Sequence, residues 1–178
     1  MDTIDIKKNY FELFDLPAQY RLNASDLDRR YQELQKQTHP DRYSAEGEHS
    51  QRLALQAASY VNSAYTTLSD PMARAIYLLE CDGIDMQAHS HALPADFLAE
   101  QIHLRERLER AADNHVALEK LLLDLRAESK LLLRQLSDQL DIHCHDKSIL
   151  SVQKLQFIKK IQEQTEAVLF ELELKNSE

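Results

Sequence analysis

The tripeptide His39-Pro40-Asp41 places an imidazole and a carboxylate on either side of a proline ring. The imidazole can donate and accept hydrogen bonds, and the carboxylate can pair with cations. Pro40 has no N–H to donate and disfavours the helical region for the residue before it, so His39 should leave its helix in an extended or turn conformation. No nucleophile is evident beside these groups, so we interpret the tripeptide as a stiff polar knob, not as a catalytic centre.

Two amphipathic helices should hold this tripeptide at the tip of a hairpin. Leu27, Tyr31 and Leu34 fall on one face of the helix before it, for which Ser25 is the expected N-cap. A helix over about residues 51–68 follows, and small apolar side chains form its buried stripe. Small residues let the two helices approach closely as an antiparallel pair.

Shorter helices flank the hairpin on both sides. The first should end with Asp15 in the left-handed conformation, which aspartate tolerates better than most side chains. The last should begin at Pro71, with Asp70 as its N-cap, and run to about Glu80. Together these elements predict a first domain over residues 1–81.

The second half of the chain reads as a linker and a helical bundle. Residues 82–94 contain the second glycine and the last proline and show little periodicity. Residues 95–178 predict three helices whose apolar stripes need one another as partners, at about 95–111, 115–141 and 148–175.

The first helix of this bundle carries two apolar strips. One strip is sufficient for the core and comprises Phe97, Leu104, Leu108 and Ala111. The second contains Leu98 and Ile102, and it lies beside Ala99, Arg105 and Glu106. Periodicity alone leaves two interpretations open: a wide core stripe, or a surface that binds a partner.

Composition favours an all-α protein. The 178 residues include only two glycines and four prolines, and the net charge is −9, with both halves acidic. A basic face for nucleic acid is therefore not expected. The amino terminus lacks an apolar signal core, and no segment approaches the ~20 apolar residues of a membrane span, so we expect a cytoplasmic protein.

The sequence around the tripeptide resembles the J domain of DnaJ-type co-chaperones. The matching flanks are Tyr10-Phe11-Glu12-Leu13 before it and Asn62-Ser63-Ala64-Tyr65-Thr66-Thr67-Leu68-Ser69-Asp70-Pro71, Arg74 and Tyr77 after it. The resemblance implies a non-enzymatic protein that docks on a heat-shock chaperone and raises the chaperone's ATP hydrolysis. The residues implied in this contact are His39, Pro40, Asp41, Arg29, Arg30, Lys36 and Arg42.

A second resemblance covers nearly the whole chain. The segments Phe97-Leu98-Ala99-Glu100-Gln101-Ile102-His103-Leu104-Arg105-Glu106 and Leu155-Gln156-Phe157-Ile158 look like the carboxy-terminal domain of the HscB family, J-type co-chaperones of bacterial iron–sulfur cluster assembly. The resemblance implies a chaperone of the HscA type and a scaffold protein of the IscU type as partners, and no cofactor. It places the scaffold-binding surface at Leu98, Ala99, Ile102, Arg105, Glu106 and Phe157, with Lys154 as a nearby charge. Ala99 stands where the family often has methionine.

Two alternatives remain open. The chain could be a J-domain adaptor for a different client, which would change only what binds the surface around Leu98. It could also be a metal-binding protein, through His143-Cys144-His145-Asp146 with His89, His91 and Cys81. Adjacent residues point in different directions and no zinc-type ligand spacing is present, so the expected metal ligands are none.

Overall fold

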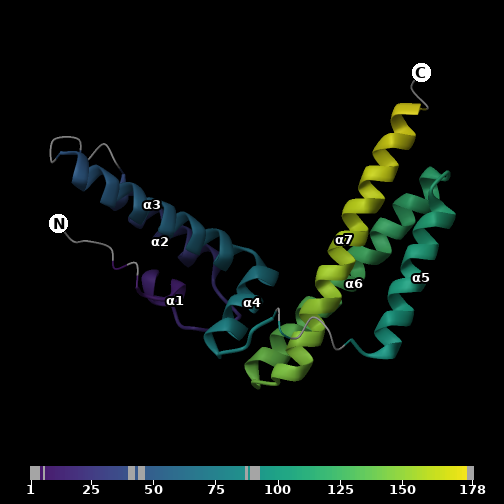
Figure 1. The fold of residues 1–178 in the computed structure, drawn as a ribbon, viewed down its shortest axis with the longest axis horizontal. Helices are drawn as coiled ribbons and strands as arrows, with labels where there is room; N and C mark the ends of the chain where they lie inside the picture. The colour runs from purple at the N-terminus through teal and green to yellow at the C-terminus, as the bar shows by residue number, and fades with distance from the viewer. Residues whose placement is uncertain are drawn as a thin grey trace. The chain divides into compact units, whose positions relative to one another are not determined.

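The fold is all-helical, as predicted. The structure is a computed structural model that describes residues 5, 7–39, 43, 47–86, 88 and 93–175, so Pro40, Asp41 and Arg42 lie outside the described residues. Within the described ranges it contains seven helices and no strand (Figure 1): α1 (Tyr10–Leu13), α2 (Ala24–Thr38), α3 (Glu48–Ser69), α4 (Pro71–Cys81), α5 (Ala95–Ala111), α6 (His115–Asp141) and α7 (His145–Lys175). These helices form two compact units that divide after Cys81.

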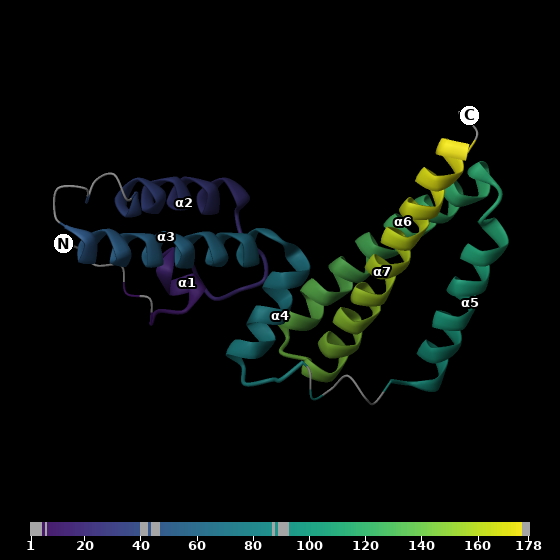
Figure 2. The same ribbon diagram turned by 45° about the horizontal axis from the view of Figure 1, so that its top comes forward.

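The first unit is built on the predicted antiparallel pair, α2 and α3. The two helices run side by side, and α1 packs against α3 (Figure 2). Small side chains on α3, including Ala54, Ala57 and Ala64, are buried and allow the close approach. The core beneath the pair consists of Phe11, Phe14, Leu27, Val61, Ala64 and Leu68.

Three local signals decide where the helices of this unit start and stop. Asp15 ends α1 with a φ of 50°, and Asp70 caps α4 by accepting a hydrogen bond from the Ala73 N–H at 2.6 Å, so both predictions are confirmed. The N-cap predicted at Ser25 is wrong. Asn23 takes that position, because α2 begins at Ala24, and its side chain accepts from the Ser25 N–H at 3.0 Å.

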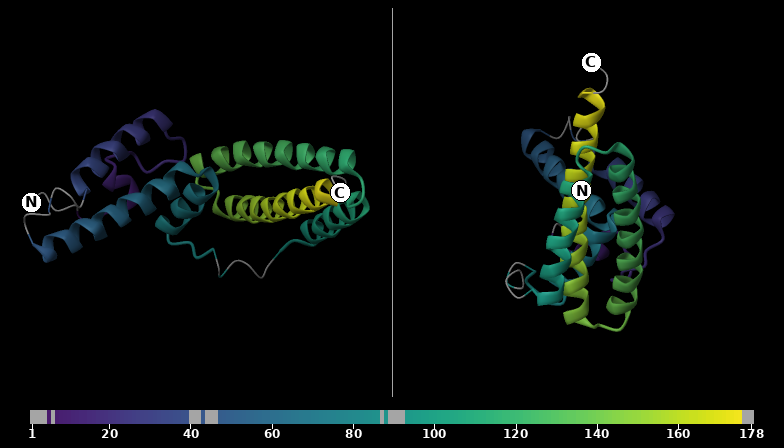
Figure 3. Two further views of the ribbon diagram at one scale, coloured as in Figure 1. Left: turned by 90° about the horizontal axis from the view of Figure 1, so that it is seen from above. Right: turned by 90° about the vertical axis from the view of Figure 1, so that its right-hand side faces the viewer.

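The second unit is the predicted three-helix bundle. α6 and α7 pack along each other, and α5 packs against both (Figure 3, left). Leucines of α6 and the apolar stripe of α7 form the core, which contains Leu118, Leu122, Leu125, Leu136, Leu155, Ile158 and Ile161. None of the described helices combines the length and apolar character that a membrane span requires.

The first residues of α3 and α7 differ from the predicted ones by more than their last residues do. α3 starts at Glu48 instead of about residue 51, and α7 starts at His145 instead of 148. The first turn of each helix is polar at most of its positions, so an apolar repeat cannot reveal it. α3 begins after Gly47, whose φ of 93° suits a glycine.

Candidate functional site

The end of α2 has the geometry that the proline predicts. Thr38 is the last helical residue, and its buried hydroxyl donates to the Leu34 carbonyl at 2.9 Å. His39 follows with φ −60° and ψ 124°, an extended conformation, so the prediction that Pro40 drives it out of the helix is confirmed. The chain therefore leaves α2 abruptly at an exposed imidazole.

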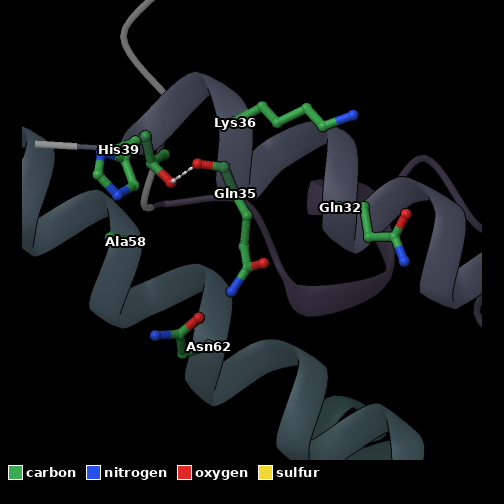
Figure 4. A pocket seen from close by; sticks show the side chains of 7 residues that line it. Gln32, Gln35, Lys36, His39, Ala58 and Asn62 are labelled. Carbon is green, nitrogen blue, oxygen red and sulfur yellow. Dashed lines mark hydrogen bonds between the residues drawn. The ribbon is translucent and has the colours of Figure 1, made fainter. Parts of the chain in front are cut away.

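A groove of about 580 Å³ lies beside His39 between α2 and α3. In Figure 4 the His39 ring turns toward α3 near Ala58, the Gln35 amide points toward Asn62, and Lys36 extends away from α3. The described residues that line the groove are Gln32, Gln35, Lys36, Thr38, His39, Ala58 and Asn62. The sequence did not reveal that Gln35 and Asn62 line one groove with His39, because their juxtaposition depends on the register between the two helices.

Hydrogen bonds and stacked rings fix that register. The Tyr31 hydroxyl donates to Asn62 Oδ1 at 3.1 Å, and the Tyr31 ring stacks on Tyr65 with centroids 4.0 Å apart. The Tyr65 hydroxyl donates to Asp28 Oδ1 at 2.8 Å, and this bond raises the pKa of Tyr65. The groove and the residue that precedes Pro40 therefore rest on a cross-linked hairpin.

The predicted basic residues of α2 have different surroundings. Arg29 is exposed and forms ion pairs with Asp26 and with Glu33, the latter at 3.0 Å. Arg30 is turned into the unit: its guanidinium donates to the Phe14 carbonyl at 2.8 Å and to Asp15 Oδ2 at 2.9 Å. Arg30 thus holds the end of α1 against α2, whereas Lys36 is exposed at the groove.

The second candidate surface lies on α5, and we call it the α5 strip: Leu98, Ala99, Ile102, Arg105 and Glu106. All five residues are exposed, with Leu98 at 45% and Ile102 at 57%. The opposite side of α5 is buried through Phe97, Leu104 and Ala111. The interpretation in which Leu98 and Ile102 complete a wide core stripe is therefore wrong.

Phe157 does not share the exposure of the α5 strip. Only 9% of this residue is exposed, because its ring packs edge-on against Phe97 at 6.1 Å between centroids. Arg105 covers it, with Cζ 5.6 Å from the ring centroid. We expected Phe157 on the binding surface, but it lies in the core under Arg105 and supports that side chain.

An ion pair that the sequence did not reveal joins α7 to α5. Lys154 Nζ lies 2.8 Å from Glu100 Oε2 and 5.4 Å from the centroid of the Phe97 ring. Lys154 was expected only as a charge near the surface. Its partner lies 54 positions away in the sequence, so no local spacing could have identified the pair. The ion pair helps to hold α5 in place beside α7.

Comparison with known proteins assigns the family. Residues 93–166 match the family model described as "HSCB C-terminal oligomerisation domain". The "Co-chaperone protein HscB homolog" of Paraburkholderia phytofirmans is 42% identical over 88% of this chain and 91% of its own length. The chain belongs to the HscB family of co-chaperones. The resemblance seen in the sequence is thereby confirmed.

Solved HscB structures extend the match to both units. The chaperone HscB from Vibrio cholerae has a TM-score of 0.81 and 36% identity, covering 93% of this chain and 99% of its own. Human co-chaperone HscB has a TM-score of 0.84 and 25% identity, covering 92% of this chain and 83% of its own. The fold is therefore that of HscB, a J domain followed by a helical bundle.

Proposed function

We propose that the protein stimulates the ATPase of an HscA-type chaperone and delivers an IscU-type scaffold protein to it during iron–sulfur cluster assembly. The observation that supports this proposal is the exposed, partly apolar α5 strip of an HscB-family chain, which lies in a different unit from His39. In this scheme residues 1–81 bind the chaperone, residues 82–94 link the units, and residues 95–178 bind the scaffold.

The chaperone contact would centre on the tripeptide and on the groove beside His39. Asp41 would pair with a cation of the chaperone, and His39 would contribute a hydrogen bond. Pro40 restricts the backbone before binding, so less entropy is lost on docking. Lys36 adds positive charge at the groove, whereas Arg29 contributes less because two carboxylates already offset its charge.

Arg30 would contribute to this contact indirectly, by holding α1 against α2. Its bonds to the Phe14 carbonyl and Asp15 engage the guanidinium inside the unit. Replacing it would loosen α1 against α2 and thereby disturb the support of the hairpin. Arg30 would therefore support the hairpin from within the unit and would not touch the chaperone.

The scaffold contact would centre on the two exposed apolar residues of the α5 strip. Leu98 and Ile102 offer an apolar centre, and Arg105 and Glu106 provide a charged rim, an arrangement typical of transient protein interfaces. Phe157 holds Arg105 from below. Ala99 makes this part of the surface shallow, so the scaffold should reach the helix backbone more closely there.

Joining both contacts in one chain raises the concentration of the scaffold at the chaperone. ATP is hydrolysed at the chaperone's own phosphoryl-transfer site, and the present protein supplies binding energy only.

ATP hydrolysis by a purified HscA-type chaperone, measured with increasing amounts of the full chain, tests the chaperone contact. Asp41→Asn should abolish the stimulation, because losing one partner of a desolvated charge pair costs about 2–5 kcal/mol. Asp113→Asn makes the same change at an exposed position of the second unit and should leave stimulation intact. Equal stimulation by Asp41→Asn and the unsubstituted chain would refute the contact.

A further inference from the structure

Three potential metal ligands converge at the corner between α6 and α7. His145 Nε2 lies 3.0 Å from Asp82 Oδ2, and His143 Nδ1 lies 3.8 Å from the same oxygen. One ligand atom from each of the three residues lies within 4.8 Å of the other two. Asp82 is distant in sequence, so this grouping results from the fold of the second unit.

The turn at this corner explains why both histidines face Asp82. α6 ends in a Schellman motif, in which the His143 N–H donates to the Leu140 carbonyl at 3.1 Å and the Cys144 N–H to the Gln139 carbonyl at 2.9 Å. His143 occupies the left-handed position of this motif with a φ of 51°, where glycine or asparagine is usual. His143 thus adopts the left-handed conformation, which histidine tolerates better than most side chains.

We propose that Asp82, His143 and His145 form a binding site for a divalent transition metal of the zinc class. Two imidazole nitrogens and one carboxylate oxygen are a common ligand set for Zn²⁺, with water completing a tetrahedron. Ligand atoms in such a site lie about 3.3 Å apart, given metal–ligand distances of about 2.0 Å. The observed 3.0 and 3.8 Å lie on either side of this spacing.

Closing the site requires only side-chain rotation. The His143 side chain is 77% exposed, so its ring can turn toward the other two ligands without displacing core residues. The exposed Asp82 carboxylate faces both histidines and would balance part of the metal's charge. An open fourth position would leave the metal accessible to solvent or to a further ligand.

His115 provides an internal comparison within the same unit. It also lies between acidic side chains, with Nδ1 3.5 Å from Glu119 Oε2 and Nε2 3.1 Å from Glu173 Oε1. Its two nitrogens point in opposite directions, so these three residues cannot share one metal ion. The ligand atoms of Asp82, His143 and His145 converge on one point, whereas those around His115 form ordinary pairs between a histidine and carboxylates.

Isothermal titration of the full chain, without any affinity tag, with Zn²⁺ tests the proposal. We expect one equivalent to bind, and Co²⁺ in its place should give the visible absorption of a tetrahedral complex. His145→Gln and His143→Asn should each abolish this binding, and asparagine suits the left-handed backbone at residue 143. His115→Gln should bind like the unsubstituted chain.

Circular dichroism must show the same helix content for all variants, so that a loss of binding reports on ligands and not on unfolding. Absence of a one-equivalent Zn²⁺ complex would overturn the proposal. Binding that survives His145→Gln, or that falls equally in His115→Gln, would also overturn it.

Discussion

Replacing Leu98 and Ile102 together by alanine should weaken scaffold binding and leave the bundle intact. Both side chains are roughly half exposed on α5. Burying a complete leucine or isoleucine side chain is worth about 1.5–3 kcal/mol, so covering the exposed half of each contributes about 1 kcal/mol. The pair then contributes about 2 kcal/mol, which corresponds to about a 30-fold rise in Kd.

The double variant is best measured by titrating an IscU-type scaffold protein into the full chain. Leu123→Ala combined with Leu131→Ala is the matched control, because both leucines are exposed on α6. Exposed substitutions outside an interface change free energies by about 0.5 kcal/mol or less, so the control should stay within about twofold of the original Kd. The melting temperatures of both variants should match the unsubstituted chain.

Two results would refute this reasoning. A Kd for the Leu98/Ile102 variant within about threefold of the original would show that the α5 strip is not the apolar centre of the contact. An equal loss in the α6 control would show that apolar surface in general, and not this strip, retains the scaffold.

Two further predictions concern stability. Phe157→Ala should lower the free energy of unfolding by about 3–5 kcal/mol in urea titrations followed by circular dichroism, because it empties a buried site; a loss below about 1 kcal/mol would contradict that burial. Burial raises the pKa of Tyr77 from 10.0 to about 12, so the folded state favours the neutral phenol. The stability that this provides should be complete below pH 10 and lost as the pH rises toward 12. All seven tyrosines lie in residues 1–81, so a titration followed by tyrosinate absorbance reports on the first unit alone. Tyr77→Phe should remove the part of this titration curve that appears at the highest pH. An unchanged curve would contradict the raised pKa of Tyr77.

Most local rules were sufficient, although the N-cap rule selected Ser25 where Asn23 caps α2. Pro40 predicts the end of α2, and the preference of aspartate for the left-handed conformation predicts the backbone at Asp15. The heptad-like leucines predict the helices of the bundle. Helical periodicity also put Leu98 and Ile102 on a different strip of α5 from Phe97, but it left open whether that strip is buried or exposed. In each case the relevant interaction lies within one or two helical turns.

Tertiary pairing was the part that the sequence could not reveal. Phe157 belongs to the family-like segment Leu155-Gln156-Phe157-Ile158, but the sequence does not show which face of that helix the bundle covers. The contact with Phe97 shows that the Phe157 side chain is buried. Arg30 looks like its neighbour Arg29 in sequence, yet it reaches the end of α1. The same holds for Asp82, which meets His145 across 63 positions.

Single-turnover ATP hydrolysis by the HscA-type chaperone tests delivery of the scaffold most directly. It should be measured with the protein alone, with the IscU-type scaffold alone and with both together. We predict that the two together stimulate more than the sum of their separate effects. The Leu98/Ile102 double alanine variant should lose this synergy but keep its own stimulation, whereas Asp41→Asn should lose both. Purely additive stimulation by the unsubstituted protein and the scaffold would contradict the proposed delivery.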